Sequence, residues 1–248
     1  MKKILLIVFI TSSIFTIFYI IGYLINNNIE KKRNKEIIEI AKNIQINKEE
    51  ITNKITETML RLKKMKIENS DIMGWIKIEG TNIDYPVLQC KNNEFYLTHN
   101  YKKEYSKMGG IFLDKDVEIN KPSTNFLIYG HRSETGEMFE DLIKYKKEEF
   151  YRKHPLIQFT TLEEDAKYEI IAVFLSKVYY KKEENVFRYY YFINANNENE
   201  FDEYIQKSIE ESLYNTGKIG QYGEQILTLS TCEYSRKNGR LVIVAKKI

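Results

Sequence analysis

The C-terminal twenty-one residues hold a thiol and a guanidinium that could act on the same substrate. Cys232 ends a β-like run that begins at Thr228, and Arg240 opens the next run, eight positions later. If residues 233–239 form a hairpin loop, helped by the turn-favouring Asn238-Gly239 pair, antiparallel pairing brings Cys232 and Arg240 side by side. An arginine beside a cysteine can lower the pKa of the thiol, and it can bind the oxyanion that forms when a carbonyl is attacked.

His131 is the natural third member of this set. It follows a predicted strand at residues 125–129 across Gly130, where a side chain can project into a groove. A nucleophile, a proton-transfer group and a fixed cation are the three side chains that thiol acyl transfer needs. The other histidines, His99 and His154, lie in predicted loops. Three scattered histidines and two cysteines lack the close spacing of zinc ligands, so we expect no metal and no other cofactor.

Two structural interpretations compete with this chemistry. Arg240 could pair with Glu233 and leave Cys232 inert. In an exported protein, Cys90 and Cys232 could instead form a disulfide. Cys90 lies at the end of a predicted strand, before a polar loop, whereas Cys232 lies beside a basic residue.

The elements that must position these residues form a predicted β domain. After Asn69-Ser70-Asp71, short β-type runs alternate with turn residues, which indicates an all-β barrel or sandwich with inserted helices. Helical spacing predicts two such insertions, at 136–150 and 197–213, and we expect Tyr189-Tyr190-Tyr191 to form an aromatic strand face. The predicted strands are 74–78, 83–88, 110–113, 125–129, 157–160, 168–176, 225–231 and 240–246.

The N-terminus carries a predicted membrane anchor. Residues 4–25 are uncharged and mostly apolar, enough at about 1.5 Å per residue to cross roughly 30 Å of hydrocarbon. Lys2 and Lys3 favour a cytoplasmic N-terminus, although the basic run at 31–33 weakens that preference. A cleaved signal peptide is the alternative, but the apolar run is longer than usual and no small-residue cleavage site follows it.

A helical segment is predicted between the anchor and the β domain. Residues 30–68 are rich in Lys, Glu, Asn and Ile, and Ile51, Ile55, Met59 and Leu62 recur at helical spacing. One or two amphipathic helices would serve as a stalk, or as a cap packed on the domain. The predicted organisation is therefore a cytoplasmic N-terminus at 1–3, a transmembrane anchor at 4–25, a helical stalk at 26–69 and a catalytic domain at 70–248.

The composition excludes one class of partner. The 248 residues are 43% hydrophobic and 29% charged, as in an ordinary folded protein. The 38 basic and 35 acidic residues are interspersed and give a net charge of +3. A concentrated basic face, which nucleic-acid binding requires, is missing from this pattern, so nucleic acid is not an expected partner.

In their order and spacing, these motifs resemble those of the sortases, the membrane-anchored cysteine transpeptidases of Gram-positive surfaces. Thr-Leu-Ser-Thr-Cys at 228–232, Arg240 before a terminal strand and Tyr-Gly-His at 129–131 carry the resemblance, which covers residues 70–248. The chain is most similar to class B. That similarity lies in the N-terminal helical extension, Asp-Tyr-Pro-Val-Leu-Gln at 84–89, Gly-Gly-Ile-Phe-Leu-Asp at 109–114, Met138-Phe139 and the helix inserted before the cysteine strand.

The resemblance implies an eight-stranded β-barrel with inserted helices and an N-terminal helical extension. It implies Cys232 as nucleophile, His131 as general acid and base, and Arg240 as the clamp for the oxyanion and the substrate. It also implies that the groove for the sorting signal is lined by Leu88, Ser230, Thr231, Tyr180, Val186 and Phe187.

The implied reaction begins when the Cys232 thiolate attacks the threonine carbonyl of a C-terminal sorting signal of the Asn-Pro-x-Thr kind. An amine of a peptidoglycan precursor or cross-bridge then resolves the thioester, so the surface protein is joined to the cell wall. The implied location is the cell membrane, crossed once, with the N-terminus cytoplasmic and the catalytic domain extracellular.

Other extracellular cysteine enzymes fit less well. A papain-like peptidase places its cysteine before its histidine, and an L,D-transpeptidase needs a Ser/Thr-x-Gly-Cys context, which is absent because Ser230-Thr231 precede Cys232. From a different class, a membrane-tethered and catalytically silent module could bind sorting signals in the same groove. Selective modification of Cys232 by a thiol-directed sulfonate would favour the enzyme.

Overall fold

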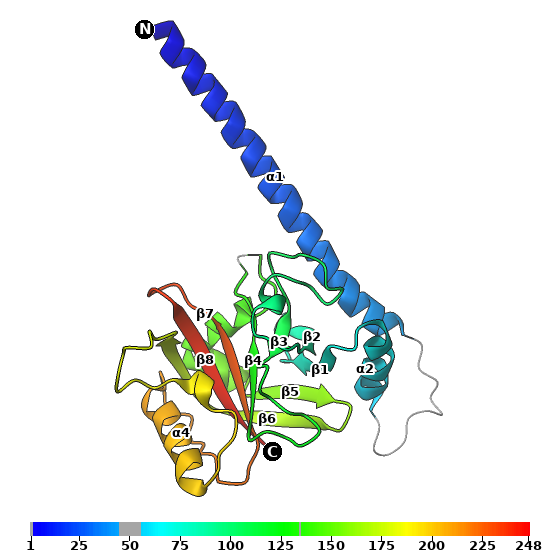
Figure 1. The fold of residues 1–248 in the computed structure, drawn as a ribbon, viewed down its shortest axis with the longest axis vertical. Helices are drawn as coiled ribbons and strands as arrows, with labels where there is room; N and C mark the ends of the chain where they lie inside the picture. Colours follow the sequence, from blue (N-terminus) through cyan, green and yellow to red (C-terminus); the bar gives the residue numbers. More distant parts are fainter. Residues whose placement is uncertain (1, 45–55, 134) are drawn as a thin grey trace.

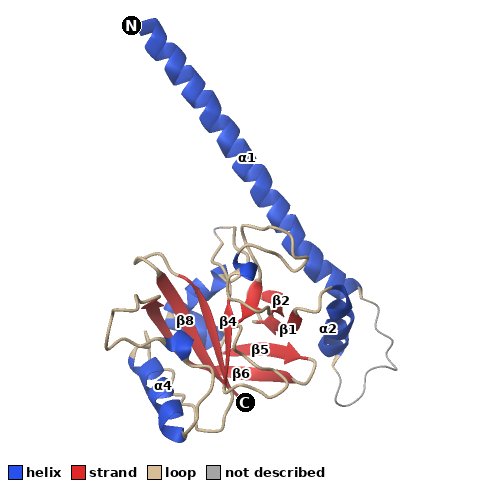
Figure 2. Cartoon of the chain, in the orientation of Figure 1, coloured by secondary structure: helices blue, strands red, loops and turns tan. Residues whose placement is uncertain are grey.

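A long N-terminal helix leads to a β-barrel that carries short helices on its outside (Figures 1 and 2). The computed structural model describes residues 2–44, 56–133 and 135–248. In the described residues, eight strands close into a barrel in the order β1-β2-β3-β4-β7-β8-β6-β5. The strands are β1 (Ile72–Lys77), β2 (Asp84–Leu88), β3 (Ile111–Leu113), β4 (Asn125–Tyr129), β5 (Leu156–Thr161), β6 (Asp165–Lys177), β7 (Ile226–Cys232) and β8 (Gly239–Lys247).

The predicted barrel is confirmed, and each predicted strand occurs. The largest difference is at the start of β6, which was predicted at residue 168 and begins at Asp165. Neighbouring strands are antiparallel except for β2 with β3 and β4 with β7, which run parallel. The β4–β7 pair matters most for the site because Cys232 ends β7 and His131 follows β4.

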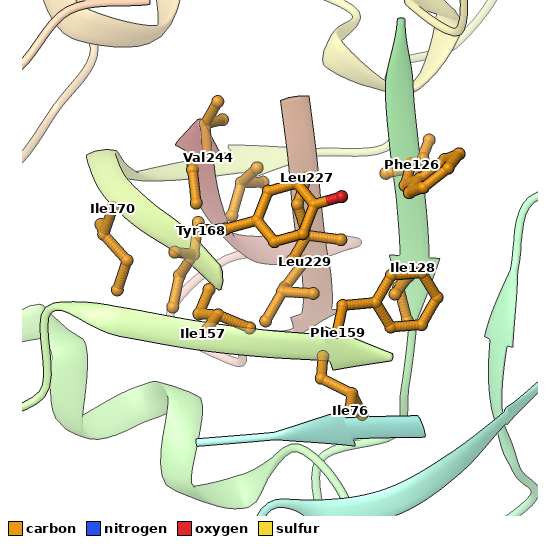
Figure 3. Packing of buried hydrophobic residues seen from close by; sticks show 14 of the residues in the cluster. Ile76, Phe126, Ile128, Ile157, Phe159, Tyr168, Ile170, Leu227, Leu229 and Val244 are labelled. Carbon is orange, nitrogen blue, oxygen red and sulfur yellow. The ribbon is translucent and has the colours of Figure 1, made fainter. Parts of the chain in front are cut away.

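Apolar side chains from successive strands fill the barrel (Figure 3). Phe159 from β5 and Leu227 and Leu229 from β7 meet there, and each is at most 1% exposed. Period-2 alternation along each strand directs such residues inward. Burial of each of these side chains stabilises the folded state by about 1.5–3 kcal/mol. The packed interior therefore holds the ends of the strands in fixed positions.

The N-terminal segment forms α1 (Lys2–Asn43) and α2 (Glu57–Glu68). From Phe9 to Asn43, α1 is long and apolar enough to cross a membrane, with a mean hydropathy of 1.6 over its most apolar 18 residues. The same helix continues without a break and packs on the barrel through Glu30, Asn34, Ile37 and Ala41, all of which are buried.

The helical segment is therefore a cap rather than a free stalk. Met59 and Leu62 of α2 are buried, as their helical spacing predicts. Ile51 and Ile55 lie outside the described residues.

Two local expectations differ from the structure. The segment 136–150 holds a 3₁₀ helix, η3 (Glu140–Lys146), followed by α3 (Glu148–Lys153), in place of one α-helix. Its fully buried side chains, Phe139, Leu142 and Tyr145, recur every three residues, which matches the 3₁₀ repeat.

Tyr189-Tyr190-Tyr191 form a 3₁₀ turn, η4, and the expected strand face is absent there. The ring of Tyr190 lies at about a right angle to each of its two neighbours, at 84° and 83°. The predicted second insertion is present as α4 (Glu198–Glu210).

Candidate functional site

The β7–β8 hairpin brings Cys232 and Arg240 into direct cross-strand register. Asn238 adopts a left-handed φ of 56°, which the turn requires and which asparagine tolerates better than most residues. A side-chain carbon at Gly239 would collide with the carbonyl oxygen of Glu233, so this position needs glycine. The hairpin expected from Asn238-Gly239 is confirmed.

The strand that carries Cys232 is held on its outer face as well as its inner one. The Tyr204 hydroxyl of α4 shares a 2.8 Å hydrogen bond with Thr228 Oγ1, and the Tyr189 hydroxyl shares one of 2.7 Å with Ser230 Oγ. Ser230 is two residues from Cys232 on the same face of the strand. The backbone that presents the thiol is therefore fixed by packing inside the barrel and by hydrogen bonds outside it.

His131 reaches the thiol because β4 runs parallel to β7. Tyr129 pairs with Ser230, and the backbone N–H of Gly130 donates to the carbonyl of Ser230 at 3.2 Å. His131 Nε2 lies 2.7 Å from the carbonyl oxygen of Leu97. A carbonyl only accepts, so Nε2 donates to it and carries a proton. The side chain of His131 is also hydrogen-bonded to that of Cys232.

This hydrogen bond shifts both pKa values in the direction that favours charge. It lowers the pKa of Cys232 below its ordinary value, with help from the positive charge of Arg240 and against the effect of burial. It also raises the pKa of His131, again against burial and with help from the Leu97 carbonyl. The site therefore increases the population of thiolate and imidazolium at neutral pH.

Removal of the imidazole should reverse the shift at the thiol. In His131→Ala the largest cause of the lowered Cys232 pKa is gone while burial remains, so the midpoint for thiolate formation should move to higher pH. The rate of iodoacetamide alkylation, followed against pH, measures this midpoint. Arg240→Ala should move it in the same direction by less. An unchanged midpoint in His131→Ala would contradict the hydrogen-bonded pair.

Neither competing structural interpretation holds in the described residues. Both cysteines are free, and Cys90 Sγ donates to the carbonyl of Asn92 at 3.2 Å. Glu233 binds Lys146 Nζ at 3.0 Å, while Arg240 Nη1 donates to the carbonyl of Gly239 at 2.9 Å. The guanidinium is therefore anchored through the backbone, without a carboxylate partner in the part of the chain that the structure describes.

A groove with a volume of about 350 Å³ runs past the thiol. The five predicted residues that it brings together are His131, Ser230, Thr231, Cys232 and Arg240. The remaining lining residues are Asn93, Leu97, Phe112, Tyr129, Gly130, Val178, Tyr189 and Tyr190.

Four residues expected in the groove lie outside its lining. Leu88 is 2% exposed and packs with Trp75 and with Ile37 of α1, so it lies under the helical cap on the outer face of the barrel. Tyr180 is 53% exposed, and its carbonyl accepts a hydrogen bond from Arg188.

Phe187 packs on the buried ring of Phe174, and Val186 precedes it outside the groove. The connection between β6 and β7 contributes Val178, Tyr189 and Tyr190 instead. The tyrosine triplet in the sequence was the available signal for this wall.

A hydrogen-bonded set opposite the thiol was also missed. Asp114, 4% exposed, accepts from Asn93 Nδ2 at 2.7 Å and from the Tyr129 hydroxyl at 2.9 Å. Asn93 and Tyr129 line the groove, so this one buried carboxylate fixes two of its walls. Among the described residues, no three His, Cys, Asp or Glu side chains gather as metal ligands.

Asp114→Asn should loosen the walls of the groove and leave the pKa of the Cys232 thiol unchanged. Asn93 and Tyr129 both donate to Oδ2, while the backbone N–H of Asp116 donates to Oδ1. An amide replaces one of these two oxygens by an NH2 donor, so at least one N–H or O–H loses its acceptor, and a buried group left unpaired costs about 1–3 kcal/mol. We expect a lower free energy of unfolding and a raised KM for peptide substrates, with the pH dependence of Cys232 alkylation unchanged. Peptide kinetics beside denaturant unfolding measure both effects; a shifted alkylation profile would mean that Asp114 acts on the thiol as well.

Comparison with known proteins gives consistent matches over most of the chain. The model of the Sortase domain family matches residues 76–248. Sortase B of Listeria monocytogenes is 34% identical over 222 residues, which are 88% of this chain and 87% of that protein. Sortase B of Staphylococcus aureus is 35% identical over 182 residues, which are 73% of this chain and 71% of that protein.

Solved structures agree with these matches. The crystal structure of sortase B from Bacillus anthracis superposes with a TM-score of 0.76 at 30% identity, over 91% of this chain and 99% of the other. Sortase B from Clostridium perfringens gives a TM-score of 0.68 at 34% identity, over 75% of this chain and 98% of the other.

Proposed function

This chain belongs to the sortase family and is a cysteine transpeptidase of the sortase B type, and we propose that Cys232, His131 and Arg240 carry out its chemistry. Enzymes of this family process and anchor surface proteins. The observation that carries the proposal is the meeting of all three side chains in one groove, with Cys232 hydrogen-bonded to His131 and in register with Arg240.

In the first half of the reaction, the Cys232 thiolate attacks the carbonyl carbon of a threonine in the substrate. A C–S bond forms and the carbonyl electrons move to oxygen, where the Arg240 guanidinium stabilises the negative charge. Collapse of this intermediate breaks the C–N bond. The His131 imidazolium donates its proton to the leaving amine, and an acyl group remains on Cys232 as a thioester.

In the second half, an amine attacks the thioester carbonyl. His131, now neutral, takes the proton from the attacking nitrogen, and Arg240 again stabilises the oxyanion. The C–S bond breaks as a new amide bond forms, and thiolate and imidazolium are restored. The raised pKa of His131 and the lowered pKa of Cys232 suit both halves, because the first half starts from the thiolate and imidazolium and the second half restores them.

The proposed substrates are a surface protein with a C-terminal sorting signal of the Asn-Pro-x-Thr kind and an amine of peptidoglycan. A short extended peptide fits a groove of this size. Apolar walls at Leu97, Phe112 and Val178 suit its side chains. The amide of Asn93 and the hydroxyls near Cys232 suit its backbone.

We further propose that α1 crosses the cell membrane once, with its N-terminus in the cytoplasm and the barrel outside. The length and hydropathy of the helix support the crossing, and Lys2 and Lys3 support the orientation. This location places the enzyme where exported surface proteins and wall precursors meet.

Mass spectrometry tests the proposal directly. The protein is incubated with a library of Thr-containing pentapeptides, and the mass of the peptide fragment that contains Cys232 is followed. We expect an acyl adduct on Cys232 from peptides of the Asn-Pro-x-Thr kind, released when an amine is added. An adduct on Cys90, or none on any peptide, would contradict the assignment.

A further inference from the structure

A basic and aromatic surface lies beside the point where α1 leaves the barrel. We define the juxtamembrane surface as Lys31, Lys32 and Lys35 of α1 together with Tyr105 and Lys107 of the loop that precedes β3. We propose that this surface lies against the headgroups of anionic phospholipids and seats the barrel on the membrane. The inference rests on the proposal that α1 spans the membrane, and it goes beyond anchoring by giving the barrel its own contact with lipid.

The first argument is the distance, measured along α1, between the end of the apolar run and the first contacts with the barrel. The apolar run ends at Ile25, and the next two residues, Asn26 and Asn27, are half-buried. Glu30, 4% exposed, is one turn further on. At about 1.5 Å per residue, Glu30 lies about 7.5 Å beyond the apolar run, close to the outer limit of a headgroup layer about 5–7.5 Å deep.

The second argument is that the loop is fixed to α1 at this distance from the apolar run. Ser106 Oγ donates to Glu30 Oε2 at 2.5 Å, and Arg33 Nη1 lies 3.4 Å from the carbonyl of Tyr105. Further along the helix, Lys102 Nζ binds Glu36 Oε1 at 2.8 Å. Figure 1 shows this loop beside the lower half of α1. Tyr105 and Lys107 are therefore held at the depth where headgroups begin.

The third argument is chemistry. Lys32, Lys35 and Lys107 are exposed, and none of the four lysines of the surface has a carboxylate within 4.0 Å among the described residues. The nearby carboxylates of Glu36 and Glu104 pair with Lys102 and Arg33. At longer range, Glu137 interacts with Lys31 and Lys35, and Glu36 with Lys32. Tyr105 is 64% exposed.

By the same rise of about 1.5 Å per residue, Lys31 and Lys32 lie about 9 and about 10.5 Å beyond the apolar run and Lys35 about 15 Å beyond it. All three are therefore within a Debye length of about 8–10 Å of the outer limit of the headgroups. Ammonium groups at this distance and an exposed tyrosine are the side chains that anionic lipid surfaces attract.

The contact would orient the site as well as hold it. The hairpin that joins β7 to β8 lies at the side of the barrel from which α1 extends (Figure 1). A barrel seated on lipid through the juxtamembrane surface therefore keeps the end of the groove with Cys232 turned toward the membrane.

Tryptophan quenching in nanodiscs tests the contact. The full chain is inserted, one copy per disc, in neutral discs or in discs that contain phosphatidylglycerol, both with a lipid that carries a spin label on its headgroup. Tyr105→Trp reports on the juxtamembrane surface. The matched control is Tyr222→Trp, because Tyr222 is also exposed but packs against Phe201 of α4, which lies at the end of the barrel away from α1 (Figure 1). Trp75, 8% exposed, gives a constant background. We expect stronger quenching of the tryptophan at 105 in the anionic discs.

Measurements at high salt and with lysine substitutions complete the test. At about 1 M salt the Debye length falls to about 3 Å, so the extra quenching should disappear. Each lysine near the surface is worth about a fivefold change in association, so the quadruple variant K31Q/K32Q/K35Q/K107Q should remove it too. The control K153Q/K167Q/K181Q/K182Q, which changes the net charge equally, should keep it.

Equal quenching at 105 and 222, or equal quenching in neutral and anionic discs, would overturn the inference. Failure of the chain to insert at all would contradict the membrane-spanning proposal instead, and it is read separately from co-elution of protein with discs. Neither result depends on the chemistry of Cys232.

Discussion

Cys232→Ala should abolish acyl-enzyme formation and reduce peptide cleavage by about four orders of magnitude or more. The methyl group cannot attack a carbonyl, and no other described thiol lines the groove. Removal of a nucleophile from a cooperating set costs nearly the whole rate enhancement. Cleavage of a fluorogenic Asn-Pro-x-Thr peptide measures the loss, and the intact mass after incubation with substrate measures the missing thioester.

Cys90→Ala is the matched control for this prediction. Cys90 is also free, but its sulfur donates to a nearby backbone carbonyl outside the groove. We expect wild-type turnover and a wild-type adduct. Thermal unfolding of both variants shows whether either substitution harms the fold. Cleavage retained in Cys232→Ala, with the fold intact, would remove the central claim.

Arg240→Lys should lower kcat by about 10²- to 10³-fold, the usual effect of losing one oxyanion donor. The guanidinium is planar and bonds the Gly239 carbonyl with Nη1 while its remaining N–H groups can face the acyl oxygen. A lysine ammonium keeps the charge but cannot hold both positions. Steady-state kinetics with the same peptide separate a fall in kcat from a rise in KM.

Arg236→Lys provides the control for charge and for the hairpin itself. Arg236 is exposed in the loop between β7 and β8, outside the groove. Its substitution should leave turnover unchanged. Near-normal turnover in Arg240→Lys would show that Arg240 only packs at the strand end.

The sequence predicted the strands and the pairing of Cys232 with Arg240 because both follow from local rules. Alternation along 225–231 and 240–246, with Asn238-Gly239 between them, is sufficient to predict the hairpin and the pairing of Cys232 with Arg240. The barrel and the role of His131 needed more. The residues left barrel and sandwich open and gave His131 only as a candidate beyond a predicted strand. The resemblance in motif order added the closed barrel and the acid–base role, since parallel pairing of β4 with β7 leaves no local pattern.

The walls of the groove could not be predicted in the same way. Asn93 and Tyr129 are placed by two hydrogen bonds to the same oxygen of Asp114, which join segments distant in the chain. Tyr189 enters the groove on a 3₁₀ turn, and the β-like composition of a tyrosine triplet favours a strand instead. Leu88 was assigned from the resemblance, but its side chain packs under the helical cap.

The hydrogen bond from His131 Nε2 to the Leu97 carbonyl also constrains the order of events. With Nε2 held, the proposed mechanism leaves only Nδ1 to exchange protons with both amines. The departing amine and the arriving amine must then occupy the same side of the acyl group in turn. The first product has to diffuse away before the second substrate can enter, so initial rates measured against both substrates should give the parallel double-reciprocal lines of a ping-pong enzyme.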